Sequence, residues 1–424
     1  MKPALALLAS VAALLALRTY GLPAANAPSA APAPAGAPPE KPAVDPEWPT
    51  FRGGIERRGN LDGLRGPRAP ALRWAYEGPD LKDAMIDSSP AVAGGRIVFS
   101  AACLSAFRSS GVILCLDEGG KLAWKHATEK PIFSSPAISG GRVYVGEGFH
   151  EDADCKLRAL NLSDGKLRWS FTVKSHLESS PAVAGGRVFF GAGDDGVYAI
   201  SAEDGKLVWR FPDAHVDCPP AVANDRVFAG AGYGKTRIFC LEAATGKPVW
   251  SVDTDLPILG APSIAGSRVY AGFGNGDYVK SGPTPKGAVL CLEADSGKQA
   301  WRTDLPDSVL SAIAIDGAEG YFGCRDGFVY AIDLEKGKIL RKMPCGGPVL
   351  SSPTIVKGQL FSIAAGKARL FAAATGERLW ECDLSDLVGK PAGELLSSPA
   401  VANGRLYFGT GNAAFLSIGN EAGK

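Results

Sequence analysis

The stretch that decides the fold is SPAVAGGRVFFGAGDDGVYAISAEDGKLVWRF, Ser180 to Phe211. Short β-favouring runs alternate in it with Gly-Gly, Asp-Asp-Gly and Asp-Gly turn signals. Asp-Gly favours a tight hairpin because glycine adopts a positive φ at little steric cost. The stretch therefore predicts a four-stranded antiparallel meander, with strands over 180–184, 187–191, 197–201 and 207–211.

The same pattern returns along most of the chain. The opening strand of each copy carries a proline in seven copies and Ala312 in the sixth; the prolines are Pro90, Pro136, Pro181, Pro220, Pro262, Pro353 and Pro399. These starts are 39 to 50 residues apart, which is the spacing of four-stranded propeller blades. The sequence predicts an all-β protein with an eight-bladed β-propeller over residues 47–424.

A second marker lies in the fourth strand, where Gly-Lys and two further residues precede a tryptophan. The marker occurs at Trp124, Trp169, Trp209, Trp250 and Trp301, with a close variant at Trp380 and with Arg341 replacing tryptophan in the sixth copy. After Pro399 only three strands follow, whereas ALRWAYEG around Trp74 matches a fourth strand without a preceding blade. We predict that this N-terminal strand completes the last blade and closes the ring, because closure removes exposed sheet edges.

The N-terminal residues predict export. The apolar run from Ala4 to Leu17 is shorter than the ~20 residues of a membrane-spanning helix and precedes a small-residue stretch. Residues 1–27 are therefore interpreted as a signal peptide, with an uncleaved anchor as the alternative. Residues 28–46 are rich in proline and alanine and predict a disordered tether. We expect a periplasmic or cell-envelope protein that contacts a membrane only if the N-terminal segment is retained.

The repeat resembles the pyrroloquinoline-quinone-like (PQQ-like) propellers, in which a DGKLVW-type turn and strand dock a tryptophan between blades. WPTFRGG, Trp48 to Gly54, resembles the lead-in of exported bacterial members. The resemblance implies an eight-bladed propeller and two functional branches. One branch contains quinoprotein alcohol and sugar dehydrogenases, which bind the quinone and calcium over the ring centre. The other contains non-catalytic scaffolds, including the propeller of the outer-membrane β-barrel assembly machinery.

The sequence departs from both branches. It lacks the adjacent cysteine pair of many alcohol dehydrogenases, and its first cysteine, Cys103, is too far along the chain for lipidation after the signal. We therefore expect a monomeric, non-catalytic scaffold that binds a protein partner or envelope ligand through one face, and we assign no catalytic residue. The alternatives are a small PQQ-dependent oxidoreductase and a polysaccharide-binding propeller. A net charge of +1 makes nucleic acid an unsuitable partner.

Histidines and carboxylates gather on loops that should share one face of the ring. His176 with Glu178 and His215 with Asp217 precede consecutive blades, and each i, i+2 pair points to one side of an extended chain. His150 lies in a loop between second and third strands, which emerges on the same face. Imidazole and carboxylate groups form a candidate site for a divalent transition metal. The alternative is that these groups only satisfy one another and the loop backbone, so that neither metal nor PQQ is bound.

The nine cysteines show no zinc-binding spacing. Cys115, Cys240 and Cys291 occupy third-strand positions held by alanine in sister blades, which predicts small core residues. Cys103 and Cys155 fall in predicted second-to-third-strand loops of consecutive blades and form a candidate disulfide in an oxidising compartment.

Overall fold

The computed structural model describes residues 47–61, 66–68, 70–105, 108–150 and 152–420. The predicted signal peptide or anchor (1–27) and the predicted tether (28–46) lie outside these residues. Within the described residues, no helix combines the length and the apolar character that crossing a bilayer requires.

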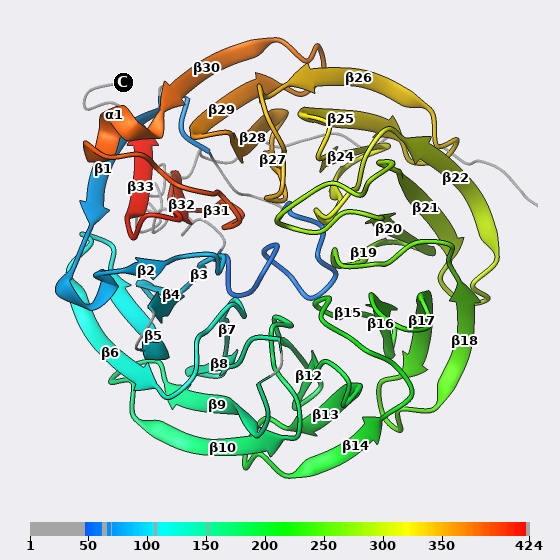
Figure 1. Ribbon diagram of the computed structural model, residues 1–424, viewed down its shortest axis with the longest axis horizontal. Coiled ribbons are helices and arrows are strands. Elements are labelled where there is room, and N and C mark those ends of the chain that lie inside the picture. Colours follow the sequence, from blue (N-terminus) through cyan, green and yellow to red (C-terminus); the bar gives the residue numbers. More distant parts are fainter. Residues whose placement is uncertain (1–46, 62–65, 69, 106–107, 151, 421–424) are drawn as a thin grey trace, which may run out of the picture. The chain divides into compact units, whose positions relative to one another are not determined.

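The described residues form a ring of eight antiparallel sheets, and in six of them the strands follow one another in chain order from the central channel outward (Figure 1). The first sheet adds β2 beside β4, and the last takes β1 as its outermost strand. This arrangement confirms the predicted eight-bladed propeller. The strands of the first four blades are β2 (Ala84–Met85), β3 (Ala91–Ala93), β4 (Arg96–Ser105), β5 (Arg108–Asp117) and β6 (Leu122–Thr128); β7 (Ala137–Ser139), β8 (Arg142–Gly146), β9 (Cys155–Asn161) and β10 (Leu167–Val173); β11 (Ala182–Ala184), β12 (Arg187–Gly191), β13 (Val197–Ser201) and β14 (Leu207–Phe211); and β15 (Ala221–Ala223), β16 (Arg226–Ala231), β17 (Arg237–Glu242) and β18 (Pro248–Asp253).

The other four blades repeat the plan, with one short α-helix, α1 (Leu384–Val388), after the seventh. A 3-10 turn, η1 (Pro79–Leu81), precedes the first blade. The strands are β19 (Ser263–Ala265), β20 (Arg268–Gly274), β21 (Gly287–Glu293) and β22 (Gln299–Leu305); β23 (Ala314–Asp316), β24 (Glu319–Gly323), β25 (Phe328–Asp333) and β26 (Ile339–Pro344); β27 (Thr354–Val356), β28 (Gln359–Ala364), β29 (Lys367–Ala372) and β30 (Arg378–Asp383); and β31 (Ala400–Ala402), β32 (Arg405–Gly409) and β33 (Phe415–Asn420), with β1 (Pro70–Tyr76).

The ring closes by pairing segments from the two ends of the described chain, as predicted. The last sheet has the order β1-β33-β32-β31, so β1 takes the outermost position of the eighth blade. Its register runs antiparallel from Pro70 opposite Asn420 to Tyr76 opposite Phe415. The pairing covers both strand edges that an open ring would expose, and those edges are sites of unwanted association.

Tryptophans join most blades to the next one. The indole Nε1 of six fourth-strand tryptophans donates a hydrogen bond of 2.8–3.3 Å to a backbone carbonyl of the following blade; these residues are Trp74, Trp124, Trp169, Trp209, Trp250 and Trp301. The indole also covers a turn glycine of that blade, so closely that a Cβ on Gly165 would lie 2.5 Å from a ring carbon of Trp124. The glycine of the marker turn thus serves both the turn and the docking of the preceding tryptophan.

The two variants of the marker dock differently. Arg341 forms an ion pair with Glu319, and its aliphatic chain passes 3.6 Å from the Cβ position of Gly376 in the seventh blade. The arginine therefore covers the glycine that tryptophan covers elsewhere. Trp380 packs against the hydrophobic cluster that contains Leu406 and Tyr407 of the eighth blade.

The first blade corrects one expectation from the sequence. Cys103 does not lie in a loop, because β4 and β5 form a long hairpin in which Cys103 pairs with Ser110 and, on its other side, with Ala84 of β2. Cys155 begins β9 in the next blade, and the structure forms no disulfide between the two cysteines. The candidate disulfide is therefore absent from the structure. Cys115, Cys240 and Cys291 are fully buried, as predicted for core residues.

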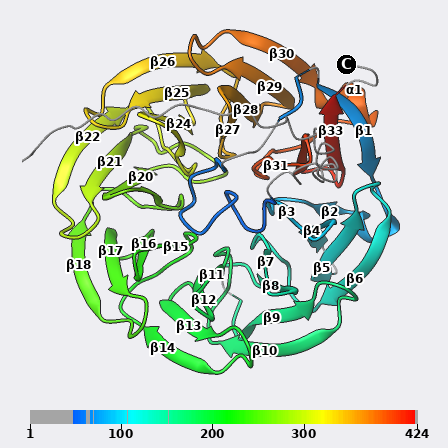
Figure 2. The same cartoon turned by 180° about the vertical axis from the view of Figure 1, so that it is seen from behind.

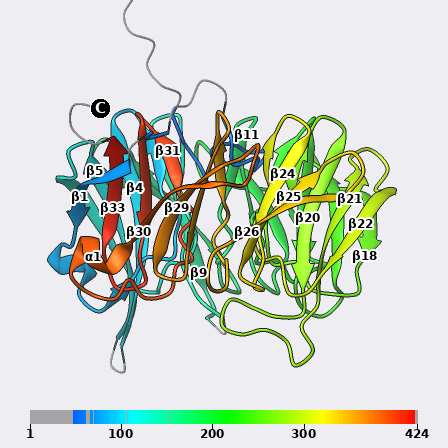
Figure 3. The same ribbon diagram turned by 90° about the horizontal axis from the view of Figure 1, so that it is seen from above.

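The lead-in, residues 48–59, crosses the centre of the ring and closes one end of the channel (Figure 2). Its backbone carbonyls accept hydrogen bonds of 2.7–3.1 Å from inner-strand amides of six blades; these amides belong to Val92, Ile138, Val222, Ile264, Ile315 and Ile355. Two buried arginines of the lead-in, Arg52 and Arg57, donate to carbonyls around the channel. The channel is thus a blind cavity, and the connection between β20 and β21 lies on the opposite side of the ring from the lead-in (Figure 3).

Candidate functional site

The cavity is lined by one residue from the entrance to each blade. At each entrance a buried apolar residue packs into the blade and the next residue faces the cavity; the cavity-facing set is Asp87, Phe133, Glu178, Asp217, Leu259, Leu310, Leu350 and Leu396. Three carboxylates therefore lie on one side, in blades one, three and four, and four leucines on the other, in blades five to eight. The cavity holds about 290 Å³, and Phe51 of the lead-in contributes to its lining.

Serines below this layer tie the inner strands to one another. The second serine of the Ser-Ser pair accepts a hydrogen bond of 2.9 Å from the backbone amide at the same position of the preceding blade, as in Ser89 to Ser135 and Ser135 to Ser180. The first serine bonds to the second strand of its own blade, as Ser179 does to the amide of Gly191 at 3.0 Å. The repeated serines therefore have a structural role, because they fix the position of the cavity-facing residues along the channel.

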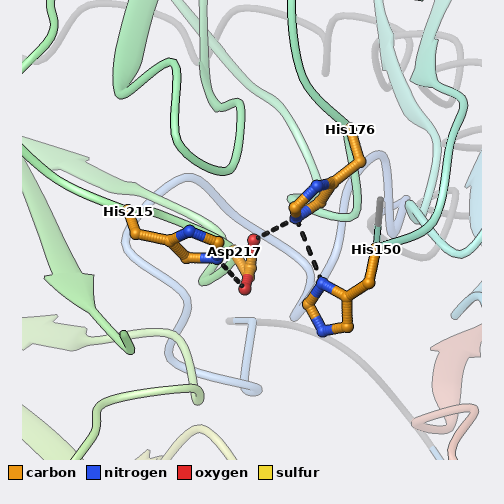
Figure 4. Close-up of side chains that lie close together, drawn as sticks. All are labelled: His150, His176, His215 and Asp217. Atoms are coloured by element: carbon orange, nitrogen blue, oxygen red, sulfur yellow. Dashed lines mark hydrogen bonds and ion pairs between the residues drawn. The ribbon is translucent and has the colours of Figure 1, made fainter. Parts of the chain in front are cut away.

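The structure brings together all five residues that the sequence proposed as a site (Figure 4 labels four of them). Nε2 of His176 is 2.9 Å from Oδ1 of Asp217, and Nε2 of His215 is 2.9 Å from Oδ2 of the same carboxylate. Nδ1 of His150 is 3.3 Å from Nε2 of His176 and 3.3 Å from Oε1 of Glu178. The fourth histidine of the chain, His126, lies apart on β6 opposite Ile113.

Glycines at strand ends let the site loops approach closely. The loops β10–β11 and β14–β15 carry the two His-x-acid pairs, and the residue between the pair members, Leu177 or Val216, is fully buried. A Cβ on Gly146 would lie 2.7 Å from Cβ of Leu177, and a Cβ on Gly191 would lie 2.4 Å from the carbonyl oxygen of Val216. These contacts hold the alternating pattern in place, so the histidine and the acid of each pair point into the site.

The charge of the site is concentrated on Asp217. Burial alone would raise the pKa of this carboxyl, but hydrogen bonds from His176 and His215 outweigh burial and hold the pKa well below its usual range. Burial would lower the pKa of His215, but its bonds to Asp217 and Asp194 raise the pKa to about 9. Burial would lower the pKa of His176, but its hydrogen bond to Asp217 and the charges of Asp217 and Glu178 together outweigh burial and raise this pKa.

Two other carboxyls of the cavity have raised pKa values. Burial, followed by the charge of Asp217, raises the pKa of Glu178 to about 7. Burial, followed by the charge of Glu394, raises the pKa of Asp87 to about 7. Asp87 was missed by the sequence reasoning, although an alignment of the blades places it at the same position as Glu178 and Asp217.

Aromatic side chains surround the histidines. Tyr233 makes edge contacts with His150 and His215, at ring-centroid distances of 5.8 Å and 5.0 Å. Phe149 contacts Phe133 at 4.8 Å. Neither Phe149 nor Tyr233 stood out in the sequence, because a single aromatic residue in a propeller loop carries no distinguishing pattern.

The long connection between β20 and β21 reaches over the cavity. Tyr278 lies in the cavity wall beside the leucines at positions 259, 310 and 350. Arg325 fixes the connection by donating to the backbone carbonyl of Asp277 at 2.7 Å. The side chain of Asp277 accepts from the amides of Val279 and Lys280, both at 2.8 Å, so this Gly-Asn-Gly-Asp stretch forms a turn.

The lining residues do not fit pyrroloquinoline quinone. The quinone carries three carboxylates, whereas the lining side chains that the structure describes include Asp87, Glu178, Asp217 and Asp277 and neither lysine nor arginine. The two nearby guanidiniums, of Arg52 and Arg57, lie in the lead-in and donate to backbone and side-chain oxygens there. An anionic quinone would therefore be placed among carboxylates, with neither lysine nor arginine in the described lining to pair with it, which is unfavourable in a buried cavity.

Comparison with known proteins links the chain to two groups of propellers. The chain is 28% identical over 151 residues to the outer membrane protein assembly factor BamB of Yersinia pestis, covering 33% of this chain and 38% of that protein. It is 30% identical over 122 residues to the quinohemoprotein alcohol dehydrogenase ADH-IIG of Pseudomonas putida, covering 25% of this chain and 16% of that enzyme. The matches thus span well under two thirds of either relative.

Solved structures share the fold at low sequence identity. BamB from Moraxella catarrhalis superposes with a TM-score of 0.66 and 18% identity, over 84% of this chain and 99% of that one. The quinohemoprotein alcohol dehydrogenase from Comamonas testosteroni superposes with a TM-score of 0.66 and 14% identity, over 89% of this chain and 81% of that one. These likenesses show the propeller fold, which a scaffold and an enzyme share.

A PQQ-like repeat family model, described as outer membrane protein assembly factor BamB, matches residues 68–161, 110–220, 213–280 and 285–424. Together these matches cover most of the chain and all eight blades. The repeats, the docked tryptophans and the closed ring agree with this match. The chain belongs to the PQQ-like propeller family and resembles BamB.

Proposed function

We propose that this protein is an exported, non-catalytic scaffold that binds a protein partner of the cell envelope through the face carrying the cavity. The observation that carries the proposal is a set of exposed apolar side chains on this face. Leu104, Phe149, Tyr233 and Val279 are 40%, 40%, 44% and 78% exposed. The last three lie in connections between the second and third strands of their blades, and Leu104 lies near the end of β4, where this strand turns into β5. All four positions lie on the same face.

A protein partner fits this surface better than a small substrate does. Exposed aromatic and aliphatic groups beside polar ones resemble the composition of protein interfaces, where Tyr and Phe supply much of the binding energy. The loops that present these side chains are anchored by the ring, so binding requires little ordering of the scaffold. The relatives named as outer membrane protein assembly factors support a partner of the same kind, a protein involved in envelope assembly.

Site-specific photo-crosslinking in cells tests the proposal. A photoreactive residue at Val279 should capture an envelope protein, whereas the same residue at Leu207, which is 52% exposed on the outer strand of the third blade, should not. The Phe149→Ser and Tyr233→Ser changes together should weaken the Val279 crosslink. Equal crosslinking from the two positions, or a Val279 crosslink that the double variant leaves unchanged, would contradict the proposal.

The second candidate is a small quinone-dependent oxidoreductase, which the similarity to quinohemoprotein alcohol dehydrogenases favours. The purified protein, supplied with the quinone and calcium, is incubated with primary alcohols or sugars and an artificial electron acceptor. The scaffold proposal expects no reduction above a protein-free control. Reduction that is lost on Asp217→Asn would establish the enzyme instead.

A further inference from the structure

We propose that His150, His176, His215 and Asp217 bind one divalent transition-metal ion with the ligand preferences of zinc. The ion joins three loops from neighbouring blades, β8–β9, β10–β11 and β14–β15, on the face of the cavity. This inference goes beyond the proposed function and does not rest on it, because a metal site of this kind can exist whether or not the face binds a protein.

The four donor groups lie close together, near the separations that a tetrahedral ion requires. One nitrogen from each histidine and one oxygen of Asp217 lie within 4.8 Å of one another. Zinc–ligand bonds of ~2.0–2.1 Å in a tetrahedron place neighbouring ligand atoms about 3.3 Å apart. Nδ1 of His150 and Nε2 of His176 are 3.3 Å apart, and each Nε2 to Asp217 contact is 2.9 Å. Small side-chain rotations are enough to move these donors around a central ion.

Hydrogen bonds outside the cluster already orient two of the imidazoles. Nδ1 of His215 is 2.6 Å from Oδ1 of Asp194, and Nδ1 of His176 is 3.2 Å from Oγ of Ser175. Each bond engages the ring nitrogen that faces away from the cluster and leaves Nε2 directed inward (Figure 4). Metal-binding histidines are oriented in this way, by a carboxylate, carbonyl or other partner on the second nitrogen.

The donor set and its surroundings select the type of ion. Three imidazoles and one carboxylate suit zinc, nickel, copper or cobalt, whereas calcium and magnesium prefer oxygen ligands. Glu178 adds a further carboxylate 3.3 Å from Nδ1 of His150, and its buried Oε1 makes no hydrogen bond. The described lining of the cavity contains no lysine or arginine that would compete as a cation. A divalent ion would therefore neutralise negative charge that the protein leaves facing the cavity.

Binding would stiffen the surface around the cavity. His150 is adjacent to Phe149, and both His150 and His215 contact the ring of Tyr233. The ion would thus fix the relative positions of loops from blades two, three and four, which carry or contact these aromatic side chains. A closed set of four protein ligands is typical of a structural rather than a catalytic metal site.

Metal titration of the purified protein, freed of metal by a chelator, tests the inference. We expect zinc to bind at one ion per chain with micromolar or tighter affinity in calorimetry, and to raise the melting temperature. Cobalt in its place should give the strong visible absorption of a tetrahedral site. Calcium and magnesium should give neither effect. Wild-type protein that takes up no zinc at 100 μM, or a cobalt complex with only weak octahedral absorption, would overturn the proposal.

Variants separate this site from adventitious binding. Asp217→Asn and His176→Ala should each weaken zinc binding at least 100-fold, whereas His126→Ala removes a histidine outside the cluster and should leave the affinity unchanged. Circular dichroism of each variant establishes that the ring is folded. His150→Ala changes a half-exposed loop residue and provides a folded variant if the buried ones fail. Zinc binding that survives in folded His150→Ala with unchanged affinity and cobalt spectrum would refute the four-ligand site.

Discussion

Replacing Arg57 by methionine should destabilise the ring strongly, although Arg57 belongs to no strand. The guanidinium is fully buried and makes five hydrogen bonds. Three of them end on buried carbonyls of Pro220, Ser180 and Pro181, at 3.0, 3.1 and 2.9 Å. These carbonyls line the channel at the entrances to blades three and four, where the lead-in replaces water as their hydrogen-bond partner.

The size of the expected loss in stability follows from the carbonyl oxygens that the methionine variant leaves without a hydrogen-bond donor. A carbonyl that loses its partner costs roughly 1–2 kcal/mol, so those of Pro220, Ser180 and Phe51 together cost about 3–6 kcal/mol. The carbonyl of Pro181 keeps a 3.4 Å hydrogen bond from Oγ1 of Thr50. Burial disfavours the charged guanidinium and lowers the pKa of Arg57 to about 9. The methionine variant does not carry this desolvation cost, which offsets part of the loss. We therefore expect a net loss of about 3 kcal/mol in the free energy of unfolding.

Chemical unfolding followed by tryptophan fluorescence provides the assay, and the adjacent arginine provides the control. Arg58 is 44% exposed and pairs with Glu56 at 2.8 Å, so Arg58→Met should cost less than about 1 kcal/mol. Both changes remove one arginine from the same segment, and they differ only in burial and in bonding to the channel. Equal unfolding midpoints for the two variants would refute the conclusion that the lead-in is a structural part of the ring.

Three other outcomes are expected. Deletion through Glu77 removes β1 and should lower the melting temperature far more than deletion through Pro46; equal melting temperatures would contradict ring closure by β1. Trp301→Ala should cost about 3–5 kcal/mol, because the indole covers a turn glycine and donates to the next blade, whereas Leu340→Ala at an exposed site should cost under about 1 kcal/mol; similar losses in denaturant unfolding would argue against docking. In metal-free buffer, the bonds of His215 to carboxylates raise its pKa from about 6.5 to about 9, so this stabilisation is complete below pH 6.5 and is lost as the pH rises through 9. The melting-temperature difference between wild type and His215→Ala should therefore shrink from pH 6.5 to pH 9. A difference that grows over this range would contradict the predicted direction of the pH dependence.

The site illustrates how far repeats can be used to predict function. The cavity-facing residue at the entrance differs between blades, and Asp87, Glu178 and Asp217 replace the leucines of later blades. The repeat predicted which loops share a face, and it therefore predicted that His176 and His215 would be neighbours. It did not predict the asymmetry of the cavity, because that depends on all eight loops at once.

The sequence by itself determined the eight blades, the docking tryptophans and the closure by the strand around Trp74. These features follow from local turn chemistry and from a periodic marker, which depend on residues close together in the chain. Only the tertiary structure decided the blind end of the channel, the placement of Cys103 within the long β4–β5 hairpin and the distances within the histidine cluster. Those features arise where residues far apart in sequence meet across the ring centre, so their geometry depends on the packing of blades against one another.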